Sequence, residues 1–238
     1  NEKDKDFYFM TEKTTRRTLE TIINLNKERL PKFYGVDPIK DIQVLTPMKK
    51  GEVGIHSLNK HLQASLNPKS PGKSEKEFGD ELFRVGDKVM QIKNNYKTEW
   101  KLMRKGIQVD IGEGVFNGDF GFITDIDNEE KIIKVLFDEE KEVEYDFTQL
   151  DELKLAYATT VHKSQGSEFP VIVMPIQWGP PMLLTRNLIY TAVTRARQLV
   201  VLVGEERYMN MMIKNNNIAT RYSSLDRKIR DYLAVFLD

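Results

Sequence analysis

Residues 155–176 read LAYATTVHKSQGSEFPVIVMPI, a segment in which two apolar runs flank a polar stretch. The runs at 155–161 and 171–176 are typical of strands that are buried on both faces, as strands of a parallel sheet are. The polar stretch follows the carboxyl end of the first run, where α/β sheets bind ligands. It offers hydroxyl, imidazole and ammonium donors for phosphates, and Gly166 allows close backbone approach. Taken alone, it fits a phosphate-binding loop or an ordinary polar loop.

Helical and strand patterns alternate on both sides of this segment. In chain order, apolar spacing predicts a helix over 19–30 that ends at Pro31, a strand over 41–47, a helix over 55–66, a helix over 185–197 capped by Thr185, a strand over 199–204 and an amphipathic helix over 225–236. Alternating helices and buried strands indicate an α/β fold with a parallel sheet flanked by helices.

The middle of the chain has a different pattern. After the strand predicted at 84–92, short strands with alternating apolar positions are separated by acidic turns, as in GDFGFITDID at 118–127. This pattern is typical of a small antiparallel barrel. We therefore expect a sheet formed by residues 1–93 and 155–238, with a barrel of residues 94–154 inserted between its two parts.

Charges are unevenly distributed, although 36 Lys and Arg balance 36 Asp and Glu. Residues 117–155 carry 13 acidic against 4 basic side chains, whereas residues 84–110 and 156–238 each have a net charge of +4. A polyanion is expected to meet the basic flanks and to avoid the acidic middle. A solvated charged surface without a partner explains the same pattern.

Composition bounds the class of protein. The chain has no Cys, and its three His form no ligand pattern, so no disulfide framework and no metal bound to its own residues are expected. No run approaches the length of a membrane helix, and the charged start NEKDKDFYFM lacks an apolar signal region. We expect a cytoplasmic protein that does not bind a membrane, and the missing initiator Met suggests a piece of a longer chain.

The helix predicted over 185–197 carries several arginines. Arg186 and Arg197 lie near one face at helical spacing, with Arg195 beside them. An arginine here either lies on the solvated side of the helix or points across a cleft at a transferring phosphoryl group. A guanidinium supplies the planar fork of donors and the permanent charge that such a group requires.

Taken together, these stretches resemble superfamily 1 DNA helicases, most closely the RecD/TraA type. Five regions carry the resemblance. The first two are DIQVLTPMKKGEVGIHSLNKHLQASLNP at 41–68, similar to the region around motif IV, and FRVGDKVMQIKNNY at 83–96, similar to the segment after it. The inserted SH3-like barrel is represented by FNGDFGFITDID at 116–127 with EYDFTQLDELKLAYA at 144–158, motif V by TTVHKSQGSEFP at 159–170, and motif VI by YTAVTRAR at 190–197. Together they span roughly residues 38–204 in the order and spacing of that type.

The resemblance implies a RecA-like second motor lobe with an inserted SH3-like β-barrel. In such helicases ATP lies between two RecA-like lobes, of which the first supplies the phosphate loop and the Mg²⁺ ligands and the second a catalytic arginine finger, here Arg195. The resemblance places Gln165, Gly166 and Glu168 with Arg195 on the nucleotide, and Thr46, Thr160, His162 and Lys163 on single-stranded DNA. It also implies ATP hydrolysis coupled to 5′–3′ translocation and duplex unwinding.

The first lobe is not evident in this sequence. A phosphate loop reads G-x-x-x-x-G-K-[ST], and Gly72-Lys73-Ser74 has Asn67 at the upstream glycine position and no buried strand before it. We interpret the tripeptide as a chance match in a surface loop. No apolar strand ends in Asp-Glu to hold Mg²⁺. The chain is thus expected to need the N-terminal RecA-like lobe of its own polypeptide for ATP hydrolysis.

Other functions remain open at this point. The barrel with its basic flanks could be a non-catalytic nucleic-acid or protein binding module, and the α/β part its scaffold. A serine hydrolase built on Ser164 or Ser167 is excluded because neither lies in G-x-S-x-G. A phosphate-loop motif upstream of residue 1 would decide for the motor.

Overall fold

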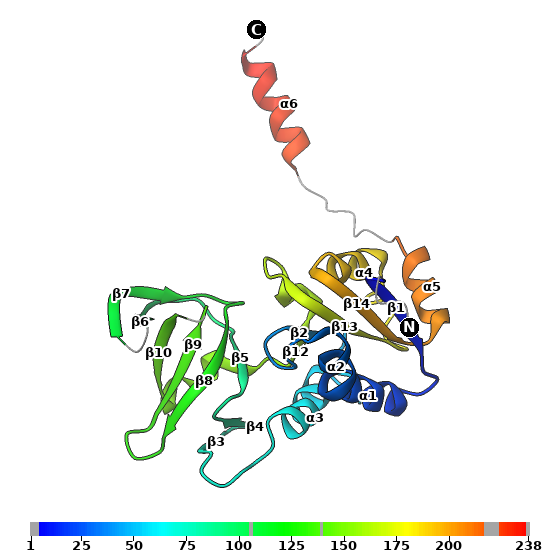
Figure 1. Cartoon of the computed structure of the whole chain (residues 1–238). Helices are drawn as coiled ribbons and strands as arrows, with labels where there is room; N and C mark the ends of the chain where they lie inside the picture. The colour runs from blue at the N-terminus through cyan, green and yellow to red at the C-terminus, as the bar shows by residue number, and fades with distance from the viewer. Residues whose placement is uncertain (1–4, 105–106, 139, 217–223, 237–238) are drawn as a thin grey trace.

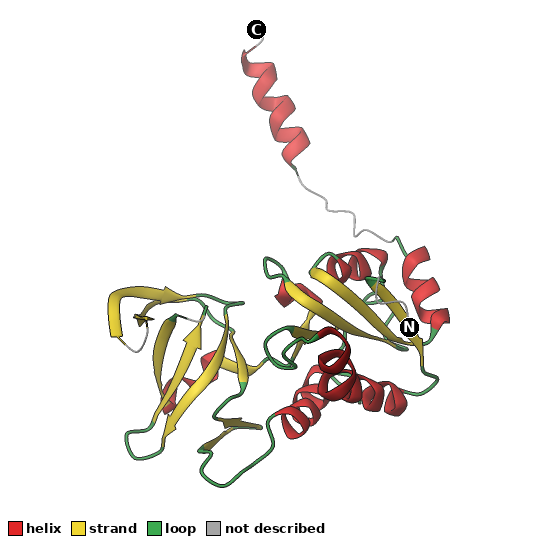
Figure 2. Cartoon of the chain, in the orientation of Figure 1, coloured by secondary structure: helices red, strands yellow, loops and turns green. Residues whose placement is uncertain are grey.

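The computed structural model describes residues 5–104, 107–138, 140–216 and 224–236. Figure 1 shows two parts side by side, a sheet with helices on both of its faces and a curled sheet with a short helical segment beside it. The secondary-structure colours of Figure 2 make the same division visible. Among the described residues, no helix combines the length and apolarity that a bilayer crossing needs.

The first part contains a five-stranded sheet in which every neighbouring pair is parallel. Its strands, in spatial order, are β1 (Phe7–Thr11), β14 (Ala196–Gly204), β13 (Phe169–Ile176), β2 (Ile42–Thr46) and β12 (Ala158–Thr160). The predicted parallel sheet is confirmed. The edge strand β1 escaped prediction because it is a single short stretch with no repeated period.

Helices cover both faces of this sheet. On one face lie α1 (Thr15–Asn24), the π-helical turn η1 (Leu25–Arg29), α2 (Leu30–Tyr34) and α3 (Ile55–Leu66), and on the other lie α4 (Arg186–Val193) and α5 (Glu206–Lys214) (Figure 1). Alternate residues of β13 enter different cores: Val171 and Val173 pack with α1 and α3, whereas Ile172 and Met174 pack with α4 and α5. Burial on both faces produces the continuous apolar run read from the sequence.

The first helix continues through Pro31, where the sequence predicted its end. A proline inside a helix removes one backbone hydrogen bond and crowds the preceding turn. The turn η1 lies directly before it, and the Leu30 N–H donates to the Leu25 carbonyl oxygen five residues back. This wider turn gives the proline room. The helix ends at Gly35, whose φ of 68° suits glycine.

The second part is a seven-stranded antiparallel sheet that curls on itself (Figure 1). Its strands, in spatial order, are β11 (Leu153–Leu155), β5 (Lys88–Gln91), β8 (Phe120–Asp127), β9 (Ile132–Phe137), β10 (Lys141–Asp146), β6 (Asn95–Arg104) and β7 (Ile107–Val115). The short helix η2 (Phe147–Glu152) joins β10 to β11. Inward-facing Ile123, Val135 and Val143 are fully buried. The predicted small barrel is confirmed, and we call this part the insert.

The boundaries of the insert differ from the predicted 94–154. Strand β5, which the sequence analysis assigned to the first part of the lobe, pairs with β8 and β11 of the insert. The apolar run 155–161 is divided, because Leu155 ends β11 in one sheet and Ala158 begins β12 in the other. A buried strand has the same apolar composition in either sheet, so its sequence does not reveal which one it joins.

A hairpin of β3 (Glu75–Phe78) and β4 (Glu81–Arg84) leads from α3 into the insert. The tripeptide Gly72-Lys73-Ser74 lies just before it, in a turn that continues into β3. A phosphate loop must lead into a helix, whose first N–H groups bind the phosphates. The interpretation of this tripeptide as a chance match is therefore confirmed.

The last described element is α6 (Leu225–Phe236), which lies apart from both sheets in Figure 1. The predicted amphipathic helix is present, and its apolar side chains Leu225, Ile229, Tyr232 and Leu233 are exposed.

Candidate nucleotide and nucleic-acid site

The polar segment 161–168 connects two parallel strands and crosses from one edge of the sheet to the other. Thr160, the last residue of β12, lies opposite Thr46, the last residue of β2. Phe169, the first residue of β13, lies opposite Ala196, the first residue of β14. The segment thus begins at the carboxyl edge and ends at the amino edge. The prediction that the whole segment lies at the carboxyl edge is therefore wrong for its second half.

At the carboxyl edge the segment forms the 3-10 helix η3 (Val161–Ser164), which packs against α4. The Thr160 hydroxyl accepts a hydrogen bond from the Lys163 N–H at 3.3 Å and caps this helix. The cap fixes the direction in which the segment leaves β12. As a result His162 and Lys163 are both exposed.

Thr46 lies beside Thr160 but has a different environment. Its side chain is fully buried, and its hydroxyl donates to the Val53 carbonyl oxygen at 2.8 Å and accepts from the Met48 N–H at 3.2 Å. The predicted contact of Thr46 with DNA does not fit this geometry, because both hydrogen-bonding directions are used inside the protein. Thr46 instead shapes the loop that follows β2.

That loop brings a second cation to η3. Partial desolvation of the otherwise exposed Lys163 ammonium lowers its pKa from the ordinary value, and the charge of Lys49 lowers it further. The two ammonium groups, one from each neighbouring strand end, are therefore close enough to repel each other. An anion between them would relieve this repulsion, and a phosphate is such an anion.

At the amino edge the segment becomes an open turn. Gly166 has a φ of 91°, which favours glycine, and a Cβ added there would meet no heavy atom within 4 Å. Gln165 next to it is exposed. Glu168 forms an ion pair with Arg197, whose Nε lies 3.1 Å from Glu168 Oε2. The backbone of this turn is thus open to a ligand from solvent.

Arg195 reaches the same turn from the end of α4. Its guanidinium donates three long hydrogen bonds, to the carbonyl oxygens of Thr191 at 3.3 Å and Ser167 at 3.4 Å and to the Thr194 hydroxyl at 3.4 Å. All three acceptors are neutral, and bonds of this length are weak. None of these acceptors therefore neutralises the charge of the half-buried guanidinium, which lies beside residues 165–168.

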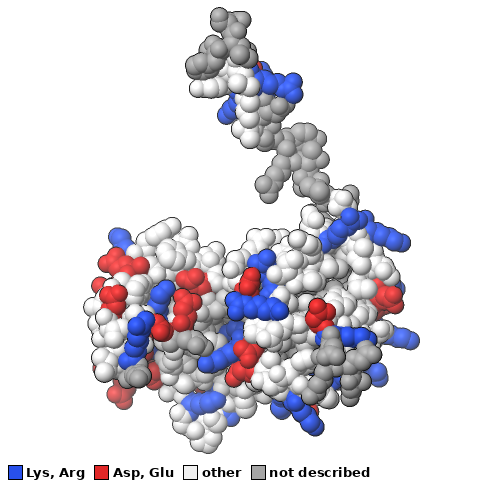
Figure 3. Space-filling view, turned by 45° about the horizontal axis from the view of Figure 1, so that its top comes forward, with Lys and Arg blue, Asp and Glu red and all other residues white. Residues whose placement is uncertain are grey.

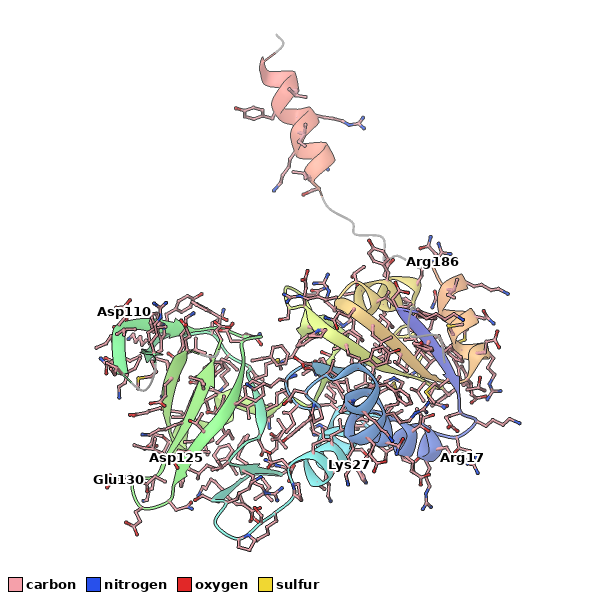
Figure 4. All side chains as sticks on the ribbon, viewed as in Figure 1. Arg17, Lys27, Asp110, Asp125, Glu130 and Arg186 are labelled. Atoms are coloured by element: carbon pink, nitrogen blue, oxygen red, sulfur yellow. The ribbon has the colours of Figure 1, made fainter. Side chains whose placement is uncertain are left out.

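The helix predicted over 185–197 is shorter in the structure and does not include Arg195. Strand β14 begins at Ala196, so α4 ends at Val193 and Arg195 lies in the turn between them. Arg186 lies at the other end of α4 and donates to the Ile213 carbonyl oxygen at 2.7 Å. Figure 4 shows Arg186 on the side of the lobe beside α5, far from the insert. The arginines of this segment therefore do not form one cluster.

Carboxylates do not gather at either edge. Among the residues that the structure describes, no three His, Asp or Glu side chains are arranged to hold a metal ion. Glu168 is paired with Arg197. Mg²⁺ prefers several oxygen ligands and bound water, so these residues do not fit a magnesium site.

Two family models match the chain, in the order of its two parts. The ATP-dependent RecD-like DNA helicase SH3 domain matches residues 58–137, and the UvrD-like helicase C-terminal domain matches residues 155–203. The second match contains both the crossing segment and Arg195. The chain belongs to the RecD-like helicases. We refer to it below as the RecD-like region.

Two of the curated relatives are named as RecD proteins. The ATP-dependent RecD2 DNA helicase of Deinococcus radiodurans is 34% identical over 186 residues, which cover 78% of the RecD-like region and 23% of that protein. The RecD subunit of the RecBCD enzyme of Buchnera aphidicola subsp. Schizaphis graminum is 25% identical, over 84% of this chain and 32% of its own. The RecD-like region thus spans a third or less of the length of these curated relatives.

Solved structures with a partial likeness include Pif1 helicases. The Pif1 helicase from Bacteroides in complex with ADP-AlF3 and ssDNA has 17% identity and a TM-score of 0.46, over 94% of the RecD-like region and 55% of that chain. Pif1 helicase from Candida albicans has 15% identity and a TM-score of 0.39, over 92% and 57%.

Two features of the site were missed by the sequence analysis. Lys49 was not singled out, although it lies two residues beyond the predicted strand 41–47, whose end is paired with Thr160. The ion pair between Arg197 and Glu168 was also missed, because the two residues are 29 positions apart and come together only through the pairing of β13 with β14.

Proposed function

We propose that the RecD-like region is the second motor lobe of an ATP-dependent DNA helicase, in which ATP hydrolysis drives 5′–3′ translocation on single-stranded DNA and duplex unwinding. The crossing segment carries this proposal. One stretch of eight residues, 161–168, joins a cationic carboxyl edge to an open turn beside Arg195 at the amino edge. A movement at either end of such a segment displaces the other.

On the nucleotide side, Arg195 is the proposed finger. It approaches the γ-phosphoryl group from the opposite side of the cleft between the lobes and stabilises the charge that develops there. The open backbone at Gln165 and Gly166 and the carboxylate of Glu168 line the same position. The weak bonds that now hold Arg195 exchange at little cost for bonds to phosphate.

On the DNA side, we propose that Thr160, His162 and Lys163 contact the phosphate backbone. Hydroxyl, imidazole and ammonium groups bind phosphates without reading the bases, as a motor that moves along any sequence requires. Thr46 acts indirectly, by holding the loop that carries Lys49. A motor lobe also needs ATP and Mg²⁺ in front of Arg195, and we propose that the N-terminal RecA-like lobe of the full-length protein supplies the phosphate loop and the magnesium ligands.

Substitution of Arg195 in the full-length protein tests the nucleotide side. We expect Arg195→Ala to lower ATP turnover at saturating single-stranded DNA by about 10³- to 10⁵-fold, or roughly 4–7 kcal/mol of barrier, with a smaller effect on ATP binding. Arg195→Lys is expected to fail nearly as badly, because an ammonium lacks the planar fork.

Arg186→Ala is the matched control, because Arg186 begins the helix α4 that precedes Arg195 and its guanidinium donates to the Ile213 carbonyl oxygen of α5. Its turnover should stay close to that of the wild type. A well-folded Arg195→Ala enzyme that keeps more than about a tenth of the wild-type turnover is incompatible with the finger role.

The RecD-like region by itself gives a second test. Purified alone, it is expected to fold and to show no ATPase activity with or without single-stranded DNA, because an arginine and a turn cannot replace the donors of a phosphate loop. Adding back the missing lobe as the full-length chain should restore activity. Turnover by the isolated region at about 1 per second or faster would contradict the assignment of this chain as one lobe.

A further inference from the structure

Two aromatic side chains of the insert are exposed side by side. Tyr96 in β6 is 68% exposed and Phe116, directly after β7, is 44% exposed. Their ring centroids are 5.6 Å apart and the ring planes meet at 74°. An edge-to-face pair of this kind leaves ring surface uncovered, on which a third planar group can stack. The insert thus presents an aromatic platform to solvent, and we call Tyr96 and Phe116 the aromatic pair.

The backbone next to the aromatic pair is firmly held. The Phe116 N–H donates to Asp119 Oδ2 at 2.8 Å, and the Asp119 N–H donates back to the Phe116 carbonyl oxygen at 3.0 Å. Asn117 and Gly118 donate to Asn94 Oδ1 and to the Gln91 carbonyl oxygen, each at 2.9 Å. A ligand that stacks here does not have to order this turn first, which favours binding.

This turn lies against the DNA side of the crossing segment. A Cβ added to Gly118 would lie 3.9 Å from the carbonyl oxygen of Lys163. Figure 1 shows the end of β7 directed toward the lobe at this corner. Phe116 of the aromatic pair is therefore two positions from a residue that lies next to η3, on which His162 and Lys163 are exposed.

The acidic residues of the insert are unevenly distributed around this corner. Many of its acidic residues lie in the turns at the other end of β8, and Figure 4 shows Asp125 and Glu130 at that end, away from the lobe. Asp119 accepts the Phe116 N–H, and two exposed carboxylates, Glu99 and Glu113, lie opposite each other on β6 and β7, each three positions from a residue of the aromatic pair. Figure 3 shows basic and acidic side chains interspersed over both parts on the face in view, so the negative surface is not continuous there.

We propose that single-stranded DNA continues from η3 onto the insert, where its bases stack on Tyr96 and Phe116. This inference rests on the proposed function, since it extends the DNA path of the motor lobe. The lobe holds phosphates through η3 and the Lys49 loop, and the insert holds bases. Stacking accepts any base, because every base has a flat face, so the site suits a motor that moves along all sequences. The insert then has a binding function of its own.

The double variant Tyr96→Leu, Phe116→Leu of this chain tests the inference, measured by fluorescence anisotropy with a labelled oligothymidylate at several salt concentrations. Loss of one stacked base costs about 1–3 kcal/mol, so the dissociation constant should rise at least about 5-fold. The slope of log affinity against log salt should stay unchanged, because no cation has been removed.

Two further variants serve as controls. Phe33→Leu removes an exposed aromatic ring from α2 and should leave DNA binding unchanged. Lys163→Gln removes a proposed phosphate contact and should make the slope shallower by about 0.7. The two kinds of contact are thereby separated by salt dependence, and thermal melts check that each variant is folded.

An abasic oligonucleotide provides the second probe, because it keeps the phosphates and lacks the bases. Wild type and double variant should bind it equally, and the wild type should lose its advantage. If the double variant binds oligothymidylate as tightly as the wild type while Lys163→Gln still changes the slope, the stacking site is overturned and the DNA side of the proposed function stands. If the wild-type chain binds no single-stranded DNA at low salt, both are overturned.

Discussion

Lys88 is a buried cation at the junction between the two sheets. Its side chain is 2% exposed, and its Nζ lies 3.4 Å from the Ile42 carbonyl oxygen and 5.3 and 5.8 Å from the ring centroids of Phe169 and Phe120. Burial lowers the pKa of Lys88 to about 7, although the nearby carboxylates of Asp37 and Asp41 act in the opposite direction. The carbonyl and the rings stabilise the ammonium only in part.

This pKa determines how the stability of the RecD-like region depends on pH. The folded pKa is about 7 and the unfolded one about 10.4, so between these values the unfolded chain binds a proton that the folded chain does not. The contribution of Lys88 to the free energy of unfolding therefore rises as pH increases from about 7 toward 10. Below pH 7 both states carry the proton, and the cost of burying the charge is present in full.

We expect Lys88→Met to be more stable than the wild type at pH 6–7, by up to about 4 kcal/mol, with a difference that shrinks toward pH 10. Urea unfolding at each pH measures this difference. Lys154→Met is the matched control, because Lys154 lies on the neighbouring strand β11 with a side chain that is 45% exposed. A constant difference between Lys88→Met and the wild type across this range would show that Lys88 keeps its ordinary pKa.

At the scale of elements, Asp87 joins α3 to the strands of the insert and the lobe. Its buried carboxylate accepts hydrogen bonds from Gln63 Nε2 at 2.6 Å, Asn67 Nδ2 at 2.7 Å and the Tyr157 hydroxyl at 2.8 Å. The Arg84 N–H donates a fourth bond at 2.7 Å. Desolvation raises the pKa of Asp87, and these four bonds oppose that shift. The helix, the hairpin β3–β4 and Tyr157, which follows the last strand of the insert, thus share one acceptor.

We expect Asp87→Asn to lower the free energy of unfolding by about 2–4 kcal/mol, because the amide nitrogen would face donors and leave them unsatisfied in the interior. Chemical denaturation of the RecD-like region measures the change. Asp125→Asn makes the same substitution at an exposed position of β8 and should change stability by less than about 0.5 kcal/mol. Equal effects of the two substitutions would contradict the role of Asp87 as a shared acceptor.

The elements also show what the sequence could and could not predict. The parallel sheet was predictable because a strand buried on both faces, such as 171–176, must be apolar throughout. The end of the first helix was not, because the π turn before Pro31 depends on packing that local propensity does not encode. The direction of the crossing segment was missed because it depends on strand register. Arg195 was placed near the nucleotide side by resemblance, and the structure brings it to Ser167, but its role remains a proposal.

At the scale of the whole molecule, a net charge of zero limits how strongly the RecD-like region can bind DNA. One lobe offers half of a channel, so only three or four phosphates are expected to be neutralised. The slope of log affinity against log salt should then be roughly −2 to −3, with micromolar or weaker affinity.

The double substitution Thr160→Ala, His162→Ala should weaken this binding further at low salt, because it removes two proposed phosphate donors from η3. Loss of the Thr160 hydroxyl also removes the cap of η3, so Thr160→Ser, which retains an oxygen in that position, is the informative comparison. Unchanged affinity in the double variant would exclude η3 from the DNA path.

The stem of the insert has an evolutionary consequence. The chain enters the insert through β5 and leaves it through β11, and these strands are hydrogen-bonded neighbours, with Leu155 opposite Val89. Entry and exit are therefore separated by one strand spacing, about 4.8 Å. A gene could lengthen, shorten or exchange the insert without altering the order of β2 and β12 in the parallel sheet. Such an exchange has one local constraint, because a replacement must still cover Lys88 and Phe169. We therefore expect the residues at this junction between the two sheets to vary less among related proteins than the strands farther out in the insert.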